Sequence, residues 1–288
     1  MAAPLRFNGT AAHRPTARSG FVENVAIDGA RVQYRLAGRI GKTATIVVTG
    51  LLGVSGAYSE LTDAIAEQSG RAAICIRQSR TQGIRSLSPH ALLHPDGLLP
   101  QSVLGVMGDA QRKYGIELFD LLGHSMGGLA VFRATLRQLQ QNSGPTIRSI
   151  HLLEAAGTTE DWLLTYALHA PKMLSEARQV AQRSPQLGVE LLGFIARNPL
   201  RLAGETLHTS LSRLDPQKLH DIGRQGIRTT AVNYVRDPWL PGLAAEQRIG
   251  QAVDVFTLGN PEVAGHFAPQ LYPEAVAAEY LQTRSLVS

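Results

Sequence analysis

Short apolar segments alternate along the chain with longer segments whose apolar residues follow helical spacing. The short segments have the length and composition of buried strands, and they predict strands at residues 22–27, 32–36, 44–49, 72–76, 118–122, 147–153, 229–235 and 253–258. Helical spacing, such as Leu129, Phe132 and Leu136 at i, i+3 and i+7, predicts helices at residues 58–68, 102–114, 126–140, 244–250 and 273–281. Strands that alternate with helices predict an α/β fold with a mostly parallel, doubly wound sheet.

One long region interrupts this alternation. Residues 158–224 contain no good strand pattern, are rich in Leu, Ala, Arg and Gln, and are divided by Pro171, Pro185, Pro199 and Pro216. We interpret the region as several helices inserted between two strands of the sheet, forming a lid or cap. The predicted organisation is therefore a flexible tail at residues 1–20, a core at residues 21–157 and 225–288, and a helical lid at residues 158–224.

Composition and charge exclude several classes of protein. A chain of 288 residues with 44% hydrophobic and 18% charged residues can bury a sizeable core. The formal charge is +5, but Lys and Arg are scattered, which argues against a nucleic-acid partner. No segment approaches the roughly 18 apolar residues of a transmembrane helix, and no apolar signal region precedes the core. We therefore expect a cytoplasmic protein, with the basic tail leaving organelle targeting as the alternative; nothing in the sequence indicates an oligomeric state.

The strongest chemical signal is the segment Gly123-His124-Ser125-Met126-Gly127. It has the form Gly-x-Ser-x-Gly and lies between an apolar strand pattern and an apolar helix pattern. This context is the one that a nucleophile elbow requires, because a sharp strand-to-helix turn exposes the serine hydroxyl above the end of the sheet. A plain strand–helix turn is the alternative. We favour Ser125 as a catalytic nucleophile.

Together with Gly128, this segment resembles the nucleophile elbow of the α/β-hydrolase family, particularly its lid-bearing esterase, lipase and carbon–carbon bond hydrolase members. The resemblance covers roughly residues 22–281. It implies a catalytic triad in the order Ser, acid, His. His266 follows the last predicted strand, where the family places its histidine base. His124, inside the elbow, is expected to shape the site rather than to act as the base.

The position of the acid has two main candidates. Asp237 follows the predicted strand at residues 229–235, which is the usual acid position of the family, and precedes His266 by 29 residues. Such a carboxylate fixes the tautomer of the histidine and stabilises its protonated form. Glu154, just after the strand at residues 147–153, is the alternative acid, because some relatives use that strand end. Asp254 and Glu262 are weaker rivals.

The resemblance also implies an oxyanion hole made of two backbone N–H groups. They are expected to be those of Met126, directly after the nucleophile, and of Leu51, after the strand at residues 44–49. Thr49 stands where relatives usually carry the histidine of a His-Gly pair. Residues 77–83 likewise depart from the Asp-x-Arg-Gly that relatives often show, which indicates a divergent branch.

These features predict a serine hydrolase that cleaves an ester or thioester of a hydrophobic small molecule through an acyl-enzyme. The expected acyl pocket would be lined by apolar lid residues such as Leu163, Leu164, Tyr166, Leu191, Leu192 and Phe194. A carbon–carbon bond hydrolase, lactonase, acyltransferase or haloperoxidase uses similar residues, and a non-catalytic ligand-binding scaffold is the alternative of a different class. No metal or organic cofactor is implied, because the sequence has neither a Gly-rich phosphate loop nor a histidine cluster with metal-ligand spacing.

Overall fold

The computed structural model describes residues 21–27, 30–50, 58–77, 98–141, 144–158, 171, 175–176, 178–189, 213–234, 237, 242–258 and 265–286. Its strands are β1 (Phe21–Ile27), β2 (Ala30–Ala37), β3 (Thr43–Val48), β4 (Ala72–Arg77), β5 (Leu118–His124), β6 (Thr146–Leu153), β7 (Arg228–Tyr234) and β8 (Asp254–Leu258). Its main helices are α1 (Ser59–Ser69), α3 (Leu98–Tyr114), α4 (Met126–Gln141), α8 (Pro216–Arg224), α9 (Gly242–Ile249), α10 (Ala268–Leu271) and α11 (Pro273–Leu286). Each strand and helix that the sequence predicts outside residues 158–224 is present, with ends that differ by a few residues.

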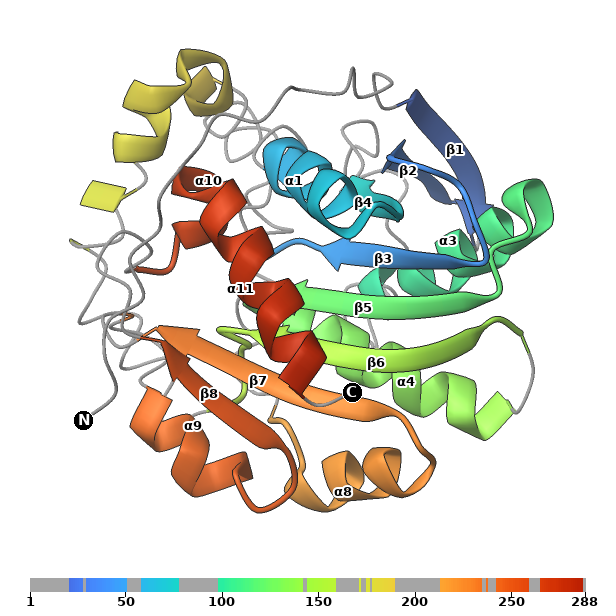
Figure 1. The fold of residues 1–288 in the computed structure, drawn as a ribbon, viewed down its shortest axis with the longest axis vertical. Coiled ribbons are helices and arrows are strands. Elements are labelled where there is room, and N and C mark those ends of the chain that lie inside the picture. The colour runs from blue at the N-terminus through green and yellow to red at the C-terminus, as the bar shows by residue number, and fades with distance from the viewer. Residues whose placement is uncertain are drawn as a thin grey trace.

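The strands form one sheet in the order β1-β2-β4-β3-β5-β6-β7-β8 (Figure 1). Strand β1 pairs with β2, and β2 with β4, in antiparallel fashion, while β4, β3, β5, β6, β7 and β8 are mutually parallel. The mostly parallel sheet that the sequence predicts is therefore confirmed. After β3 the chain moves to β4 on one side and then to β5 on the other, so the order reverses between β3 and β5. In open α/β sheets, ligands bind outside the carboxyl ends of the strands at such a point.

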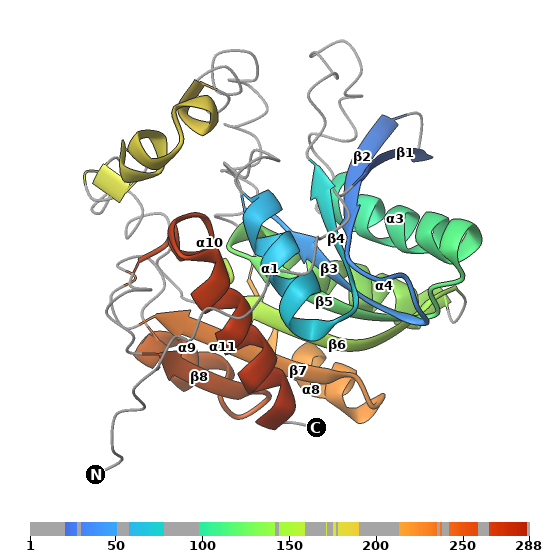
Figure 2. The same ribbon diagram turned by 45° about the horizontal axis from the view of Figure 1, so that its top comes forward.

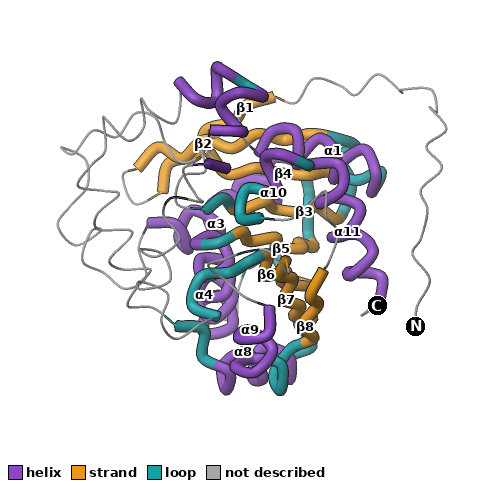
Figure 3. The backbone as a smooth tube through the Cα atoms, turned by 90° about the vertical axis from the view of Figure 1, so that its left-hand side faces the viewer, coloured by secondary structure: helices purple, strands orange, loops and turns teal. Residues whose placement is uncertain are grey.

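Helices cover both faces of the sheet (Figure 3). Buried side chains of α3, α4, α8 and α9 pack on one face, and those of α1, α10 and α11 pack on the other. Neighbouring residues of one strand face opposite sides, since side chains alternate along a strand: Ile46 belongs to the first core and Val47 to the second. Both faces of the central strands are buried, which explains why these segments are apolar without alternation.

The region predicted as a lid is described only in part. Helical segments at residues 178–183 and 185–189 lie on the same side of the molecule as α10 (Figure 2). Helix α8, at the end of this region, packs on β7 and α4, and Leu219 and Ile222 are fully buried there. The apolar residues expected to line the acyl pocket lie outside the described residues, so the lid stays a prediction. No helix among the residues described above is long and apolar enough to cross a membrane.

Candidate active site

Ser125 occupies a sharp turn between β5 and α4. Its φ is +54°, a left-handed conformation that non-glycine residues rarely adopt. The turn is fixed by the next strand: the amide of Ser125 donates to the carbonyl of Leu153 at 3.0 Å, and the amide of Ala156 donates to the carbonyl of Ser125 at 2.9 Å. Strained backbone of this kind persists where the surrounding structure determines it, and it is concentrated at functional sites.

Two glycines of the turn are required by close backbone approach. A Cβ atom on Gly127 would lie 2.2 Å from the carbonyl oxygen of Val48, in β3. A Cβ atom on Gly123 would lie 2.4 Å from the carbonyl oxygen of Gly127. Since backbone atoms cannot move aside as a flexible side chain can, only glycine fits at either position. The Gly-x-Ser-x-Gly pattern is therefore explained by the packing of β5 and α4 against β3.

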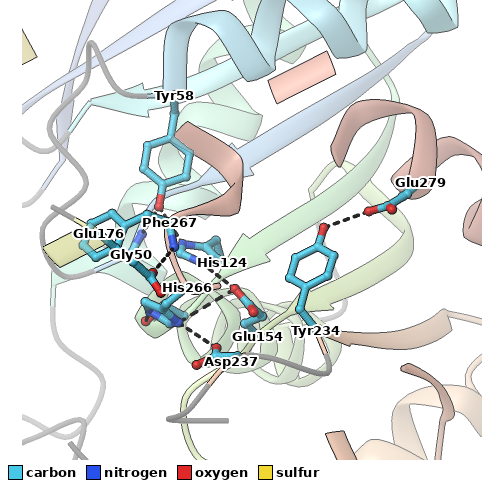
Figure 4. Close-up of polar contacts among 11 residues, drawn as sticks. Gly50, Tyr58, His124, Glu154, Glu176, Tyr234, Asp237, His266, Phe267 and Glu279 are labelled. Atoms are coloured by element: carbon cyan, nitrogen blue, oxygen red, sulfur yellow. Dashed lines mark hydrogen bonds and ion pairs between the residues drawn. The ribbon is translucent and has the colours of Figure 1, made fainter. Parts of the chain in front are cut away.

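The structure brings together Ser125, His266 and Asp237, which the sequence predicts as a triad. The Nε2 atom of His266 lies 3.0 Å from the Oγ atom of Ser125. The Nδ1 atom of His266 lies 3.0 Å from the Oδ2 atom of Asp237 (Figure 4). All three residues are buried, with relative exposures of 7%, 7% and 2% for Ser125, His266 and Asp237. These distances match those of a Ser-His-acid triad, in which the acid holds Nδ1 and Nε2 accepts the hydroxyl proton.

Glu154, the alternative acid, lies at the same site but farther from the histidine. Its Oε2 atom is 3.8 Å from Nδ1 of His266 and 3.4 Å from Nε2 of His124. Burial raises the pKa of Glu154 well above its ordinary value, and the charge of Asp237 and a hydrogen bond with it raise that pKa further. The longer distance and the raised pKa of Glu154 both favour Asp237 as the charged partner of His266.

A chain of hydrogen bonds links His124 to the loop after β3. The Tyr58 hydroxyl, just before α1, lies 2.6 Å from Nδ1 of His124 and accepts from the amide of Gly50 at 3.4 Å (Figure 4). Burial raises the pKa of Tyr58, so its hydroxyl keeps the proton and donates it to Nδ1. Burial, together with the charge of His266, lowers the pKa of His124 well below its ordinary value. His124 is therefore neutral, and its single proton is assigned to Nε2, which faces Glu154.

Glu176 contacts the loop that carries His266. Its Oε2 atom accepts from the amide of Phe267 at 3.3 Å, and its Oε1 atom lies 2.6 Å from the position that a Cβ on Gly265 would take. Sequence reasoning missed both Glu176 and Tyr58, because neither belongs to a motif and each reaches the site only through tertiary packing. The one weak signal for Tyr58 is its place at the start of the helix that follows β3.

Of the two expected oxyanion donors, one is described. Met126 begins α4, so its amide has no acceptor within the helix, and its role as an oxyanion donor stays a prediction. Leu51 lies outside the described residues. Its neighbour Gly50 approaches the nucleophile closely, since a Cβ on Gly50 would lie 3.0 Å from the Cβ of Ser125. The loop after β3 therefore begins beside Ser125.

His124, Glu154 and His266 offer possible metal-ligand atoms within 4.8 Å of one another, although no histidine spacing in the sequence suggests a metal site. The nitrogens that face Glu154 are Nε2 of His124 and Nδ1 of His266. The latter is the atom that contacts Asp237. A cation bound between the three side chains would therefore compete with Asp237 for His266.

A family model described as an alpha/beta hydrolase of unknown function (DUF915) matches residues 100–159, which contain the nucleophile turn and Glu154. No curated protein matches the chain by sequence. Among solved structures, a bacterial membrane phospholipase A, described as a virulence factor, aligns with a TM-score of 0.67 at 14% identity, over 93% of this chain and 86% of that one. The protein has the α/β-hydrolase fold.

Other structures with this fold are similar to the chain over most of their length. The 2-hydroxy-6-oxo-6-phenylhexa-2,4-dienoate hydrolase of Rhodococcus sp. strain RHA1 aligns with a TM-score of 0.65 at 14% identity, over 94% of this chain and all of that one (100%). An esterase of Rhodococcus sp. ECU1013 aligns with a TM-score of 0.61 at 14% identity, with coverages of 94% and 100%. At this identity the similarity establishes the α/β-hydrolase fold and leaves the reaction open.

Proposed function

We propose that the protein is a serine hydrolase that cleaves a carboxylic ester or thioester of a hydrophobic small molecule. The observation that carries the proposal is the pair of 3.0 Å contacts that joins Ser125 to His266 and His266 to Asp237. An activated serine at the carboxyl end of β5 suits acyl transfer, and several proteins of similar structure are named as esterases.

In the first half-reaction, the Oγ atom of Ser125 attacks the carbonyl carbon of the substrate while Nε2 of His266 takes the hydroxyl proton. Asp237 stabilises the imidazolium through Nδ1. The negative charge on the carbonyl oxygen is accepted by the amide of Met126 and, as the resemblance implies, by that of Leu51. Collapse of the tetrahedral intermediate breaks the ester bond, and the alcohol or thiol leaves with the proton from His266.

The second half-reaction returns the enzyme to its starting state. Water attacks the acyl carbon and gives its proton to Nε2 of His266, and the resulting intermediate releases the carboxylic acid as Ser125 takes the proton back. The hydrophobic character of the substrate rests on the apolar residues of the proposed lid at residues 158–224. No step requires a metal or an organic cofactor.

Hydrolysis of p-nitrophenyl esters from acetyl to palmitoyl tests the proposal. We expect wild type to act on short or medium chains and Ser125→Ala to lose at least about a hundredfold in kcat/KM. Ser285→Ala, which removes an exposed hydroxyl on α11, is the matched control and should keep wild-type activity. A fluorophosphonate probe should label wild type at Ser125. Absence of both ester hydrolysis and labelling would reject the activated serine and favour a ligand-binding scaffold.

Carbon–carbon bond hydrolysis is the second candidate, because a dienoate hydrolase and a carbazole-degradation serine hydrolase have similar structures. It would use the same Ser125 and His266, with water as the final acceptor of the acyl group. Loss of absorbance from a 2-hydroxy-6-oxo-hexa-2,4-dienoate, with no turnover of any p-nitrophenyl ester, would favour this reaction over ester cleavage.

A further inference from the structure

Glu154 shares an unusual backbone conformation with the nucleophile. Among the residues that the structure describes, Ser125 and Glu154 are the non-glycine residues with a positive φ, at +54° and +43°. The amide of Glu154 donates to the carbonyl of Val232 at 2.8 Å, so the end of β6 is held against β7. A left-handed glutamate is strained, and such strain is typical of functional positions. The proposed mechanism gives Glu154 no role.

The side chain of Glu154 is completely buried and faces other polar groups from every side. His124 approaches Glu154 from β5, His266 from the loop before α10, and Asp237 from beyond the end of β7. Glu176, which belongs to the predicted lid region, adds a further negative charge nearby. Among the described residues no Lys or Arg forms an ion pair with Glu154. An ionised Glu154 would therefore be a buried anion beside a second anion, Asp237, which is an unfavourable arrangement.

We propose that Glu154 is a positioning residue held as a neutral carboxylic acid, which joins His124 to Asp237 and leaves the charge on Asp237 to pair with His266. The proposal rests on the proposed hydrolase function. One negative charge at Nδ1 balances the imidazolium that forms during Ser125 attack. A second charge 3.8 Å away would favour the protonated imidazole before attack and so remove the base.

Two further observations support the neutral form. The Oε1 atom of Glu154 is buried and has no hydrogen-bond partner among the described residues, which costs less for a neutral acid than for a carboxylate that shares its charge between both oxygens. Burial, Asp237 and Glu176 all raise the pKa of Glu154, and the opposing hydrogen bond from the amide of Tyr234 does not reverse the shift. With Nε2 of His124 donating to Oε2, the proton of Glu154 is available to Asp237.

The first experiment compares kcat/KM against pH for wild type, Glu154→Gln, Glu154→Leu and Asp237→Asn on the best p-nitrophenyl ester. Gln keeps the size and hydrogen bonds of a neutral acid, so we expect a few-fold loss and an acidic limb at the wild-type pH. Leu removes the contacts with His124 and Asp237, so we expect a loss in kcat of about a hundredfold from misplacement, with KM changed little. Asp237→Asn should lose about 10⁴-fold.

Glu279→Gln is the matched control, because Glu279 lies on α11 and accepts a hydrogen bond from the Tyr234 hydroxyl, away from His266 (Figure 4). It should leave both activity and the acidic limb as in wild type. If Glu154 were ionised, Glu154→Gln would move the acidic limb to lower pH by about one unit or more. If Glu154 were the triad acid, Glu154→Gln would lose the larger factor and Asp237→Asn the smaller one. Either result would overturn the proposal.

The second experiment needs no activity. A glutamate that is neutral when folded and ionised when unfolded takes up a proton on folding above its ordinary pKa of 4.5. Stability from this group is therefore complete below pH 4.5 and is lost as pH rises, so the unfolding constant of wild type should grow relative to that of Glu154→Gln by up to about tenfold per pH unit. Urea unfolding between pH 4.5 and 8 measures the ratio, which should stay constant for Glu279→Gln relative to wild type.

The two experiments separate the two proposals. A constant ratio for Glu154→Gln would reject the neutral acid, whatever the protein catalyses. A growing ratio together with full activity in Ser125→Ala would reject the hydrolase mechanism while leaving Glu154 a neutral buried acid. Thermal unfolding of Glu154→Leu shows whether the inactive variant is still folded. The higher activity expected of Glu154→Gln than of Glu154→Leu distinguishes a positioning role from a general packing role.

Discussion

The fully buried His151 on β6 should make the protein less stable as the pH falls from neutral to mildly acidic. Its Nδ1 atom lies 2.5 Å from the Thr230 hydroxyl, its Nε2 atom lies 3.2 Å from the Ser149 hydroxyl, and its ring meets the edge of Tyr280. Burial lowers the pKa of His151 from 6.5 to about 4. The charge of Asp120 opposes this shift in pKa, while the charges of Arg284 and Arg148 add to it. The folded protein therefore keeps His151 neutral.

The sign and size of the effect follow from proton uptake. Below pH 6.5 the unfolded chain binds a proton at His151 that the folded protein excludes down to about pH 4. The stability that neutral His151 contributes is therefore complete above pH 6.5. It is lost as the pH falls towards 4, at up to about 1.4 kcal/mol per pH unit. The whole interval corresponds to about 3 kcal/mol, which is a large part of the roughly 5–15 kcal/mol that stabilises an ordinary domain.

Urea unfolding of wild type and His151→Gln, followed by far-UV circular dichroism at several pH values from 7 to 4, tests this reasoning. Gln retains hydrogen-bonding groups and does not titrate. We expect the stability advantage of wild type over the variant to shrink by about 3 kcal/mol across the range. Other titrating groups are common to both proteins, and His220→Gln, on the exposed side of α8, should run parallel to wild type. An advantage that stays constant to pH 4 would show that His151 is accessible to protons in the folded protein.

Two further predictions concern the packing of the sheet. Asp120, buried on β5, forms ion pairs with Arg148 and with Arg284 of α11. Asp120→Asn should therefore lower the free energy of unfolding by about 3 kcal/mol at pH 7, as measured by thermal or urea unfolding. Burial raises the pKa of Asp120, but the two arginines and Ser149 outweigh it and lower the pKa on balance. The difference in stability between wild type and Asp120→Asn should therefore vanish as the pH falls below about 3.8. A difference that persists there would contradict the ion-pair explanation. Gly127→Ala should prevent folding or cost about 3 kcal/mol or more, because its Cβ would meet the backbone of β3. In the control Gly223→Ala, on α8, the new Cβ meets no atom within 4 Å apart from its chain neighbours and its own helix backbone, so the change should raise the free energy of unfolding by about 0.5–1 kcal/mol, as helix propensity predicts.

The sheet and its flanking helices were predictable because their signals are local. Strands β3, β4 and β5 are mostly apolar segments, and α4 shows helical spacing over its whole length. The nucleophile turn was predictable for a different reason. Close backbone contacts at Gly123 and Gly127 leave no space for a side chain, so only glycine fits and the motif is visible in the sequence. The short helix α10 was not predicted, since four residues are too few to show a helical period.

Contacts made by isolated polar residues could not be predicted in the same way. Tyr58 reaches His124 across 66 residues of sequence, and Glu176 reaches Phe267 across 91. A tyrosine before a helix and a glutamate in a helical region are ordinary residues in their local context. Only the tertiary contacts of Tyr58 with His124 and of Glu176 with the amide of Phe267 give them polar partners.

The two candidate acids show most clearly where sequence reasoning ends. Strands β5, β6 and β7 are neighbours, so Ser125 and Glu154, directly after β5 and β6, and Asp237, shortly after β7, follow strand ends spaced about 4.8 Å apart. One imidazole can reach both carboxyl groups in this arrangement. In the sequence, Glu154 and Asp237 both follow the end of a predicted strand, so their positions alone do not distinguish them. Burial makes two adjacent carboxylates unfavourable, so one of the pair keeps its proton. The residue at 3.0 Å from His266, rather than the one at 3.8 Å, is better placed to hold the charge, and this assigns the proton to Glu154.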